Sequence, residues 1–403
     1  MSRLARCHNV ADLREAARRR LPRFVFEFMD RGTEDEVALR ENRAGFERLR
    51  LRPEVLVDVS RRSLAVELLG KPSNLPLAMS PTGAAGLCWH EGELALAKAA
   101  ARAGVPFALS TTAITSMERV ASAAGGRLWF QLYMWRDRAL SYELVARARA
   151  AGYEALILTV DTPVGPNREY NLRNGFSVPF NPSVRSAWDL ARHPGWVINT
   201  LGKYLRTTGM PRHENYPAQF QRSITSDPVT KLAMKNDSMS WADIPRLRDI
   251  WPGTLMIKGI LRAEDAVRAV EQGADAIIVS NHGDRNMDSS VAPIDALSEV
   301  AAAVAGRCTV LLDSGVRRGS DIVKAVALGA DAVLVGRPVL YGIATAGEAG
   351  ALHAIELLRN ELDKTMAFMG CNTMADLRPD HVTPDRRAAP RAEAQHRVIK
   401  AAE

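Results

Sequence analysis

The feature of the sequence that most constrains the fold is a regular alternation of short apolar segments with helix-length segments, beginning near Leu75. The apolar segments are rich in β-branched and aliphatic residues, as buried parallel strands are. They lie at 75–79, 106–109, 128–132, 155–160, 254–257, 276–279, 309–312 and 332–335. Amphipathic segments lie between them at 92–103, 138–151, 263–272, 294–305 and 320–328. Eight such units predict an α/β fold, a (β/α)8 TIM barrel.

An internal repeat supports this prediction. The sequence Gly-Ala-Asp-Ala-Ile-Ile-Val begins at Gly273, and Gly-Ala-Asp-Ala-Val-Leu-Val begins at Gly329. Each is typical of a helix that ends on glycine and turns directly into a strand. Two copies of one helix-to-strand junction indicate that the chain repeats a single structural unit.

The chain outside the barrel falls into two terminal parts. Residues 1–70 are expected to form a helical extension, with helices at 21–32 and 34–46 that cap the bottom or edge of the barrel and a short hairpin within 42–69. The barrel is expected to occupy 71–375. Residues 376–403 are rich in Pro, Arg and Ala, so we expect a tail that is poorly ordered or docked on a neighbouring subunit.

One connection between strands is much longer than a barrel needs. Between the fourth and fifth strands the chain carries an insertion at about 177–235, in which Trp188, Trp196 and Tyr204 are mixed with Arg and Lys residues. This mixture suits a helix that lies on an anionic lipid surface. An active-site lid or an oligomer contact is the alternative interpretation.

Composition limits the class of protein. No apolar run approaches the 18 residues of a membrane-spanning helix, and the start of the chain has no apolar signal region. The four cysteines are far apart and have no metal-ligand spacing, so we expect reduced thiols, no metal and a cytoplasmic location. The net charge of +7 is spread among acidic residues, which favours small anionic ligands or a peripheral contact with the inner membrane face over nucleic acid.

Polar residues follow every predicted strand, at the end of the barrel where such enzymes keep their active sites. After the sixth strand, His282 could take a proton and Arg285 could bind a carboxylate. After the seventh and eighth strands, glycines and arginines at 313–319 and 336–337 predict a phosphate site. Lys258 ends the fifth strand and could either form a Schiff base or stabilise an anionic ring.

Several of these motifs together resemble the FMN-dependent 2-hydroxy acid dehydrogenases and oxidases, a family that includes glycolate oxidase, L-lactate dehydrogenase and (S)-mandelate dehydrogenase. The resemblance covers roughly residues 8–380. Stretches at 57–64, 81–83 and 314–341, and the long insertion, are most similar to bacterial (S)-mandelate dehydrogenases, in which the insertion is a membrane-binding segment. The motifs are Phe-Gln-Leu-Tyr at 130–133, Thr-Val-Asp-Thr-Pro at 159–163, Lys-Gly at 258–259, Ser-Asn-His-Gly-Asp-Arg at 280–285 and Asp-Ser-Gly-Val-Arg-Arg-Gly at 313–319.

The resemblance implies a role for each matching residue. His282 would be the base, oriented by Asp161, and Arg285 would hold the substrate carboxylate with help from Arg168 and Tyr133. Lys258 would lie at the N1 edge of the flavin. Gly83, Ser110, Gln131 and Thr159 would contact the isoalloxazine, with Ser280 nearby. The remaining FMN-binding residues, which include those at the ribityl chain and phosphate, would be Pro81, Thr82, Asp313, Gly315, Arg317, Gly336 and Arg337.

Three residues depart from the family pattern. Phe28 stands where a tyrosine hydroxyl usually contacts the substrate carboxylate, a charge-assisted hydrogen bond worth about 1.5–3 kcal/mol. Asp284 stands where glycine or alanine is usual, and it could act on His282, pair with Arg285 or point away from both. Thr112 stands where glycolate oxidase has tryptophan, which favours a bulkier or aromatic substrate.

These residues predict FMN-dependent oxidation of an (S)-2-hydroxy acid, mandelate-like or L-lactate, to the 2-oxo acid by a homotetramer. Gly83, in place of the alanine common in oxidases, and the insertion favour a quinone-type acceptor. An oxidase that makes hydrogen peroxide, a flavin-binding protein that has lost turnover and a barrel isomerase acting on phosphorylated substrates are the alternatives.

Overall fold

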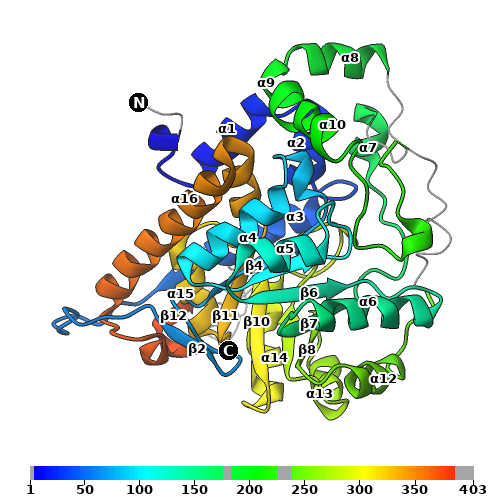
Figure 1. Ribbon diagram of the computed structural model, residues 1–403. Coiled ribbons are helices and arrows are strands. Elements are labelled where there is room, and N and C mark those ends of the chain that lie inside the picture. Colours follow the sequence, from blue (N-terminus) through cyan, green and yellow to red (C-terminus); the bar gives the residue numbers. More distant parts are fainter. Residues whose placement is uncertain (1–3, 176–182, 226–236, 386–403) are drawn as a thin grey trace, which may run out of the picture.

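A closed barrel of eight parallel strands forms the centre of the computed structural model, which describes residues 4–175, 183–225 and 237–385 (Figure 1). Each observed strand overlaps one predicted from the sequence, so the predicted (β/α)8 barrel is confirmed. The strands are β4 Leu77–Thr82, β5 Phe107–Ser110, β6 Leu128–Leu132, β7 Ala155–Thr159, β8 Thr254–Ile260, β9 Ala276–Val279, β10 Thr309–Asp313 and β11 Ala332–Val335. The barrel closes where β11 pairs with β4.

The outer helices form because each presents an apolar face to the barrel. In α4 the buried residues include Leu94, Leu96 and Ala97, and the helix ends on Gly104, whose positive φ of 69° is a frequent helix stop. Helix α16 has a kink at Ala346 and Gly347, whose backbone angles are not helical. These helices are α4 Gly92–Ala103, α5 Met117–Ala124, α6 Arg138–Ala150, α12 Asp243–Ile250, α13 Ala263–Glu271, α14 Pro293–Val304, α15 Gly319–Ala327 and α16 Arg337–Met369.

The hairpin lies later in the chain than predicted and closes the bottom of the barrel. Strands β2 Val66–Leu68 and β3 Lys71–Ser73 pair around Leu69 and Gly70, which both have the positive φ that a two-residue hairpin turn requires. Leu68 belongs to the apolar cluster of the barrel interior, together with Trp129 and Met256. The prediction of a hairpin within 42–69 is therefore wrong in position, and the hairpin crosses the predicted boundary at residue 70.

The amino-terminal helices are η1 Leu4–Arg6, α1 Val10–Arg20, α2 Arg23–Asp30 and α3 Val37–Glu47. Helix α1 packs along α16 (Figure 1). The expectation that the helices at 21–32 and 34–46 cap the bottom or edge does not hold for α2. Phe24 and Phe28 of α2 line a cavity at the opposite end, where the carboxyl ends of the strands meet.

The first part of the predicted tail is ordered and packs on its own chain. Strand β12 Val382–Pro384 pairs antiparallel with β1 Leu49–Leu51. Two short 3-10 helices, η5 Met374–Asp376 and η6 Pro379–His381, precede it. The prediction of a poorly ordered or subunit-docked tail is thus wrong for 376–385, and residues 386–403 lie outside the described residues.

The described part of the insertion, 183–225, lies next to α2 at the mouth of the barrel (Figure 1). The aromatic residues in it do not all face outward. Trp188 is exposed, but Trp196 is buried and donates through its indole N–H to the Leu87 carbonyl at 2.7 Å. Tyr204 is also buried, and its hydroxyl accepts from the Glu91 N–H at 2.9 Å. The described elements between residues 169 and 225 are α7 Glu169–Asn174, α8 Val184–Ala191, α9 Pro194–Trp196, the π-helical turn η3 Val197–Leu201, α10 Gly202–Thr207 and η4 Ala218–Phe220. The turn η2 Ala85–Leu87, which follows β4, contacts η3.

Within the described ranges, no helix combines the length and apolar character that crossing a bilayer requires.

Candidate active site

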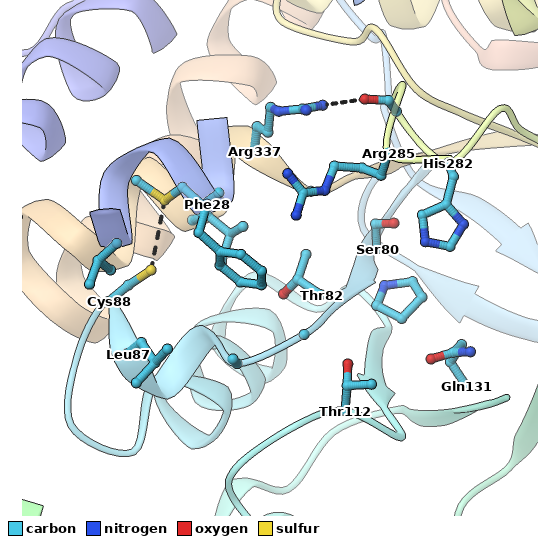
Figure 2. A pocket seen from close by; sticks show the side chains of 18 of the residues that line it. Phe28, Ser80, Thr82, Leu87, Cys88, Thr112, Gln131, His282, Arg285 and Arg337 are labelled. Atoms are coloured by element: carbon cyan, nitrogen blue, oxygen red, sulfur yellow. Dashed lines mark hydrogen bonds between the residues drawn. The ribbon is translucent and has the colours of Figure 1, made fainter. Parts of the chain in front are cut away.

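A cavity of about 720 Å³ lies at the carboxyl ends of the barrel strands, between the barrel, α2 and the insertion (Figure 2). This volume falls in the range of cofactor and small-molecule sites. Ser110, Ser280 and Asp161 lie behind the residues that line it. The predicted site residues that line the cavity are Pro81, Thr82, Gly83, Gln131, Tyr133, Thr159, Arg168, Lys258, His282, Arg285, Asp313, Gly315, Arg317, Gly336 and Arg337.

His282 is held between a carboxylate and a phenol. Its Nδ1 lies 2.8 Å from Asp161 Oδ1, and its Nε2 lies 3.1 Å from the Tyr133 hydroxyl. Because an ionised carboxylate only accepts, Nδ1 carries a proton, and when Nε2 carries none it accepts from the Tyr133 hydroxyl. The nitrogen at the cavity side is therefore the one able to take a proton.

The Asp161 carboxylate is kept charged by its neighbours. Burial alone would raise the pKa of Asp161, but the charge and hydrogen bond of His282 and the charge of Lys258 outweigh burial and hold that pKa below its usual range. Thr162 Oγ1 at 3.1 Å and Asn286 Nδ2 at 3.2 Å also donate to Oδ1. A charged, fixed Asp161 orients the imidazole and stabilises its protonated form.

The loop after β9 owes its shape to three consecutive residues with left-handed backbone angles. His282, Gly283 and Asp284 have φ values of 61°, 66° and 60°. Such angles are unfavourable for histidine, so other contacts must hold the loop. The His282 N–H donates to Ser280 Oγ at 3.0 Å, and the Gly283 N–H donates to Ser314 Oγ at 2.9 Å.

Two guanidinium groups meet beside His282 without a carboxylate partner among the described residues. Arg285 donates to the Arg31 carbonyl and the Tyr170 hydroxyl, and Arg168 donates to the Arg285 carbonyl. Burial, with the charge of Arg168 next, lowers the pKa of Arg285 to about 9. Two cations that repel each other in a cavity form a site for an anion such as a carboxylate.

Phe28 faces this anion site from α2. Its ring centre lies 5.1 Å from the guanidinium carbon of Arg285 (Figure 2). The contact is a cation–π interaction rather than a hydrogen bond. Phe28 therefore packs against Arg285 but offers no hydroxyl to a bound carboxylate.

Asp284 points away from His282 and Arg285, toward the amino-terminal segment. Thr33 donates to it through its hydroxyl at 3.1 Å and its N–H at 3.3 Å. A Cβ atom on Gly32 would lie 1.8 Å from Asp284 Oδ2, so only glycine fits there. Of the three positions that the sequence left open for Asp284, the structure has the one that points away, and the side chain is fully buried.

Lys258 is paired as an ammonium. Its Nζ lies 2.8 Å from Asp313 Oδ2 and 2.8 Å from Ser280 Oγ. Burial would raise the pKa of Asp313, but the charge and hydrogen bond of Lys258 lower it. An ammonium paired in this way is suited to stabilise negative charge beside it, which favours that option over a Schiff base.

Ser110 does not line the cavity but hydrogen-bonds to Gln131, which does. Its hydroxyl donates to Gln131 Oε1 at 2.9 Å, and Gln131 Nε2 donates to Thr159 Oγ1 at 2.9 Å. This chain of hydrogen bonds fixes the direction of the Gln131 amide. Ser110 and Ser280 therefore orient residues that line the cavity and do not themselves line it.

Arg317 and Arg337 also line the cavity without a carboxylate partner within the described residues, and Arg337 lies next to Arg285, since both donate to the Arg31 carbonyl. Arg337 donates to the carbonyls of Asp30, Arg31 and Gly283. Burial lowers the pKa of Arg317 to about 10. Loops after strands seven and eight of a barrel that present arginines and glycines form a phosphate site.

Sequence reasoning missed two contributors to the site. Asn286 donates to the carboxylate and backbone carbonyl of Asp161, a role that no local pattern indicates. His213, on the insertion, lines the cavity although it is 69 residues before His282 in the chain. Among the parts of the chain that the structure describes, no cluster of three metal-binding side chains occurs.

Comparison with known proteins agrees with this geometry. The family model of the FMN-dependent dehydrogenases matches residues 17–384. The chain is 42% identical to (S)-mandelate dehydrogenase of Pseudomonas putida, over 93% of each chain. It is 43% identical to an L-lactate oxidase of Nostoc, over 92% of this chain and 96% of that one.

A solved structure described as the monotopic membrane protein (S)-mandelate dehydrogenase superposes with a TM-score of 0.87 at 42% identity. The match covers 94% of this chain and 100% of that chain. Dehydrogenases and oxidases both occur among the relatives, so the comparisons leave the specific substrate and acceptor open. The chain belongs to the family of FMN-dependent dehydrogenases that oxidise 2-hydroxy acids, and its cofactor is FMN.

Proposed function

We propose that this protein oxidises an (S)-2-hydroxy acid with a mandelate-like or L-lactate side chain to the 2-oxo acid. The observation that supports this most is the position of His282, which lines the cavity together with Arg168 and Arg285, two guanidiniums that have no carboxylate partner among the described residues. A 2-hydroxy acid carries its carboxylate one bond from the carbon that is oxidised. The site can therefore bind the acid and remove its proton at the same time.

The residues present fit FMN. Arg317 and Arg337 supply two cations for its phosphate. Lys258 and Asp313, which form an ion pair in the same cavity, could hydrogen-bond to a polar edge of the flavin ring. A Cβ on Gly336 would have no contact closer than 3.6 Å, so the loop there leaves room for a ligand. Bound FMN supplies the two-electron acceptor of the reaction.

The chain's own residues would bind the substrate and transfer its proton. Arg285 binds the carboxylate with help from Arg168 and from Tyr133, whose hydroxyl lies 3.1 Å from His282 Nε2. His282 Nε2 takes a proton from the substrate, and Asp161 stabilises the imidazolium that results. Conversion of the alcohol to the ketone releases two electrons and two protons in all.

We also propose a quinone-type acceptor reached at the inner face of the cell membrane. Four apolar side chains of the insertion are largely exposed: Val184 at 90%, Trp188 at 68%, Ile198 at 57% and Leu205 at 56%. Apolar side chains with basic neighbours such as Lys203 suit an anionic lipid surface. The similar solved structure is described as a monotopic membrane protein.

Vesicle flotation tests the membrane contact. Replacing Trp188, Ile198 and Leu205 by serine should release the protein from anionic vesicles while its FMN content is kept. Serine at Val55 and Leu56, which are even more exposed and lie on another loop, is the control and should leave binding unchanged. Equal flotation of both variants would refute this contact.

Anaerobic mixing of the holoenzyme with (S)-mandelate and with L-lactate tests the main proposal. We expect at least one of them to bleach the flavin absorbance. If neither does, the substrate assignment is wrong, and a flavin protein without turnover becomes the better explanation.

In air, stoichiometric hydrogen peroxide would identify an oxidase, whereas slow peroxide release with rapid quinone reduction would identify a dehydrogenase. The expected homotetramer can be checked by light scattering of the eluted holoenzyme.

A further inference from the structure

His213 is a polar residue of the cavity that the reaction described above does not use. It follows α10 on the insertion, and its Nδ1 lies 3.0 Å from the backbone oxygen of Thr112, just after β5. Because a carbonyl oxygen can only accept, Nδ1 must carry the proton. The imidazole is therefore fixed as the tautomer whose Nε2 has a lone pair.

The segment that carries His213 forms a rigid wall. Its ring stacks on Tyr216, with centroids 4.6 Å apart and planes at 21°. Tyr216 packs edge-on against the buried Trp135 at 5.3 Å. Asn215 accepts from the Met117 N–H at 2.8 Å and donates to the Thr115 carbonyl at 2.9 Å, which ties the wall to the barrel. His213 is thus positioned by packing and not only by one hydrogen bond.

The second nitrogen of His213 has no partner among the described residues. Nε2 forms no hydrogen bond there and is not fully enclosed by them, and His213 lines the cavity. Burial lowers the pKa of His213, which keeps the ring neutral and Nε2 an acceptor. Apolar Met210 and Ile224 line the same region. A lone pair in such surroundings is satisfied only by a donor that enters the cavity.

His213 faces the side of the cavity opposite the carboxylate site. Thr112 follows β5, whereas Arg168 follows β7, two strands away around the barrel, and Arg285 follows β9, four strands away. Figure 2 shows Thr112 and Arg285 on opposite sides of the cavity. A 2-hydroxy acid held by its carboxylate at the arginines would therefore direct its side chain toward His213.

We propose that His213 determines substrate specificity by accepting a hydrogen bond from a donor group, such as a hydroxyl, on the side chain of the 2-hydroxy acid. This inference rests on the proposed function and narrows its substrate class. A site built to pair a hydroxyl discriminates against the analogue that lacks it, because its own polar atom is then left unpaired. The preferred substrates are hydroxylated relatives of mandelate rather than mandelate itself.

The test compares matched acids on the FMN-loaded protein. Anaerobic flavin reduction is measured with (S)-mandelate and its 3- and 4-hydroxy derivatives. Binding is measured separately by calorimetry with phenylacetate and its 3- and 4-hydroxy derivatives, which lack the oxidisable hydroxyl. We expect at least one hydroxylated acid to be favoured about ten-fold or more over its parent in both measurements.

Two variants separate pairing from packing. The amide nitrogen of His213→Asn can still donate to Thr112, but nothing replaces Nε2, so the preference should disappear while the parent acids bind as before. The amide of His213→Gln can reach the Nε2 position and should keep part of the preference. An unaltered preference in His213→Asn, or none in the wild type, would overturn the inference. If no acid bleaches the flavin, the proposed function fails instead, and the calorimetry still decides the role of His213.

Discussion

The Asp161→Asn substitution tests the role given to the carboxylate behind His282. In the wild type, Oδ1 accepts from His282 Nδ1 at 2.8 Å and from two further donors, Thr162 and Asn286. An asparagine would keep an oxygen at that position because all three donors still point at it. The substitution therefore removes the charge and leaves the geometry close to that of the wild type.

The size of the effect follows from that lost charge. A hydrogen bond to a charged group contributes about 1.5–3 kcal/mol, and this contribution is needed most when the imidazole becomes protonated. Loss of that amount in the transition state slows flavin reduction about 10- to 150-fold. The new amide NH₂ would also occupy the place of Oδ2, which is buried and has no hydrogen-bond partner among the described residues. Because the wild type already has an unpartnered atom at that place, this replacement alone should change the free energy of unfolding little.

Stopped-flow mixing under anaerobic conditions measures the rate of flavin reduction directly, and denaturant unfolding measures the free energy of unfolding. Asp288→Asn is the matched control. Asp288 is a buried carboxylate of the same loop that accepts from the Asp35 and Ala38 N–H groups and does not line the cavity. We expect the control to lose stability but to reduce its flavin within about two-fold of the wild-type rate, since it leaves the hydrogen bonds of His282 in place. A rate for Asp161→Asn within three-fold of wild type would refute this reasoning.

Three further predictions concern two residues that line the cavity, Arg285 and Gly83, and one buried behind it, Asp284. Arg285→Met should raise the dissociation constant of phenylacetate, measured by calorimetry, at least about ten-fold with FMN content unchanged, because a buried charge-assisted contact is lost. Gly83→Ala would place a Cβ 2.4 Å from Thr112 Oγ1, so it should lower the unfolding temperature, and Gly83→Ala with Thr112→Ala should recover most of the loss. Asp284 predicts a pH effect: burial raises its pKa to about 6 from 3.8, so the folded state holds its proton longer than the unfolded chain. The stability of the wild type relative to Asp284→Asn should then fall by up to about 2 kcal/mol, after allowance for solvent screening, as pH rises from about 4 to 6, with no further change above pH 7.

Each of these predictions has an outcome that contradicts it. Unchanged phenylacetate affinity in Arg285→Met would remove that residue from the carboxylate site. Failure of the Thr112→Ala change to rescue Gly83→Ala would place the clash elsewhere. A stability difference for Asp284 that is flat between pH 4 and 6, measured by urea unfolding, would show that its carboxyl is not shifted.

The strands and the residues at their ends could be predicted from the sequence because both are local. The run Ala276–Val279 is apolar throughout, and His282 and Arg285 follow it at a fixed spacing, so the fold of the barrel alone places them at its mouth. The same holds for Lys258 at β8 and Arg337 after β11.

The features that sequence reasoning missed are set by contacts between distant segments. Strand β1 pairs with β12 more than 330 residues later, which no local pattern indicates. Trp196 looked suited to a lipid surface, but the Leu87 carbonyl pairs its indole and buries it. The orientation of Asp284 depends on Gly32, and that of His213 on Thr112, so neither could be read from the residues around it.

The most direct test of the account is flavin reduction in the His282→Gln holoenzyme. The variant should bind FMN, and a 2-hydroxy acid that bleaches the wild type should still bind and perturb the flavin spectrum, since Arg285 and Arg168 are untouched. Its flavin should nevertheless stay oxidised over many wild-type half-times, with a rate reduced at least about 10²-fold. Bleaching of the variant at a rate close to that of the wild type would contradict the assignment of His282 as the base.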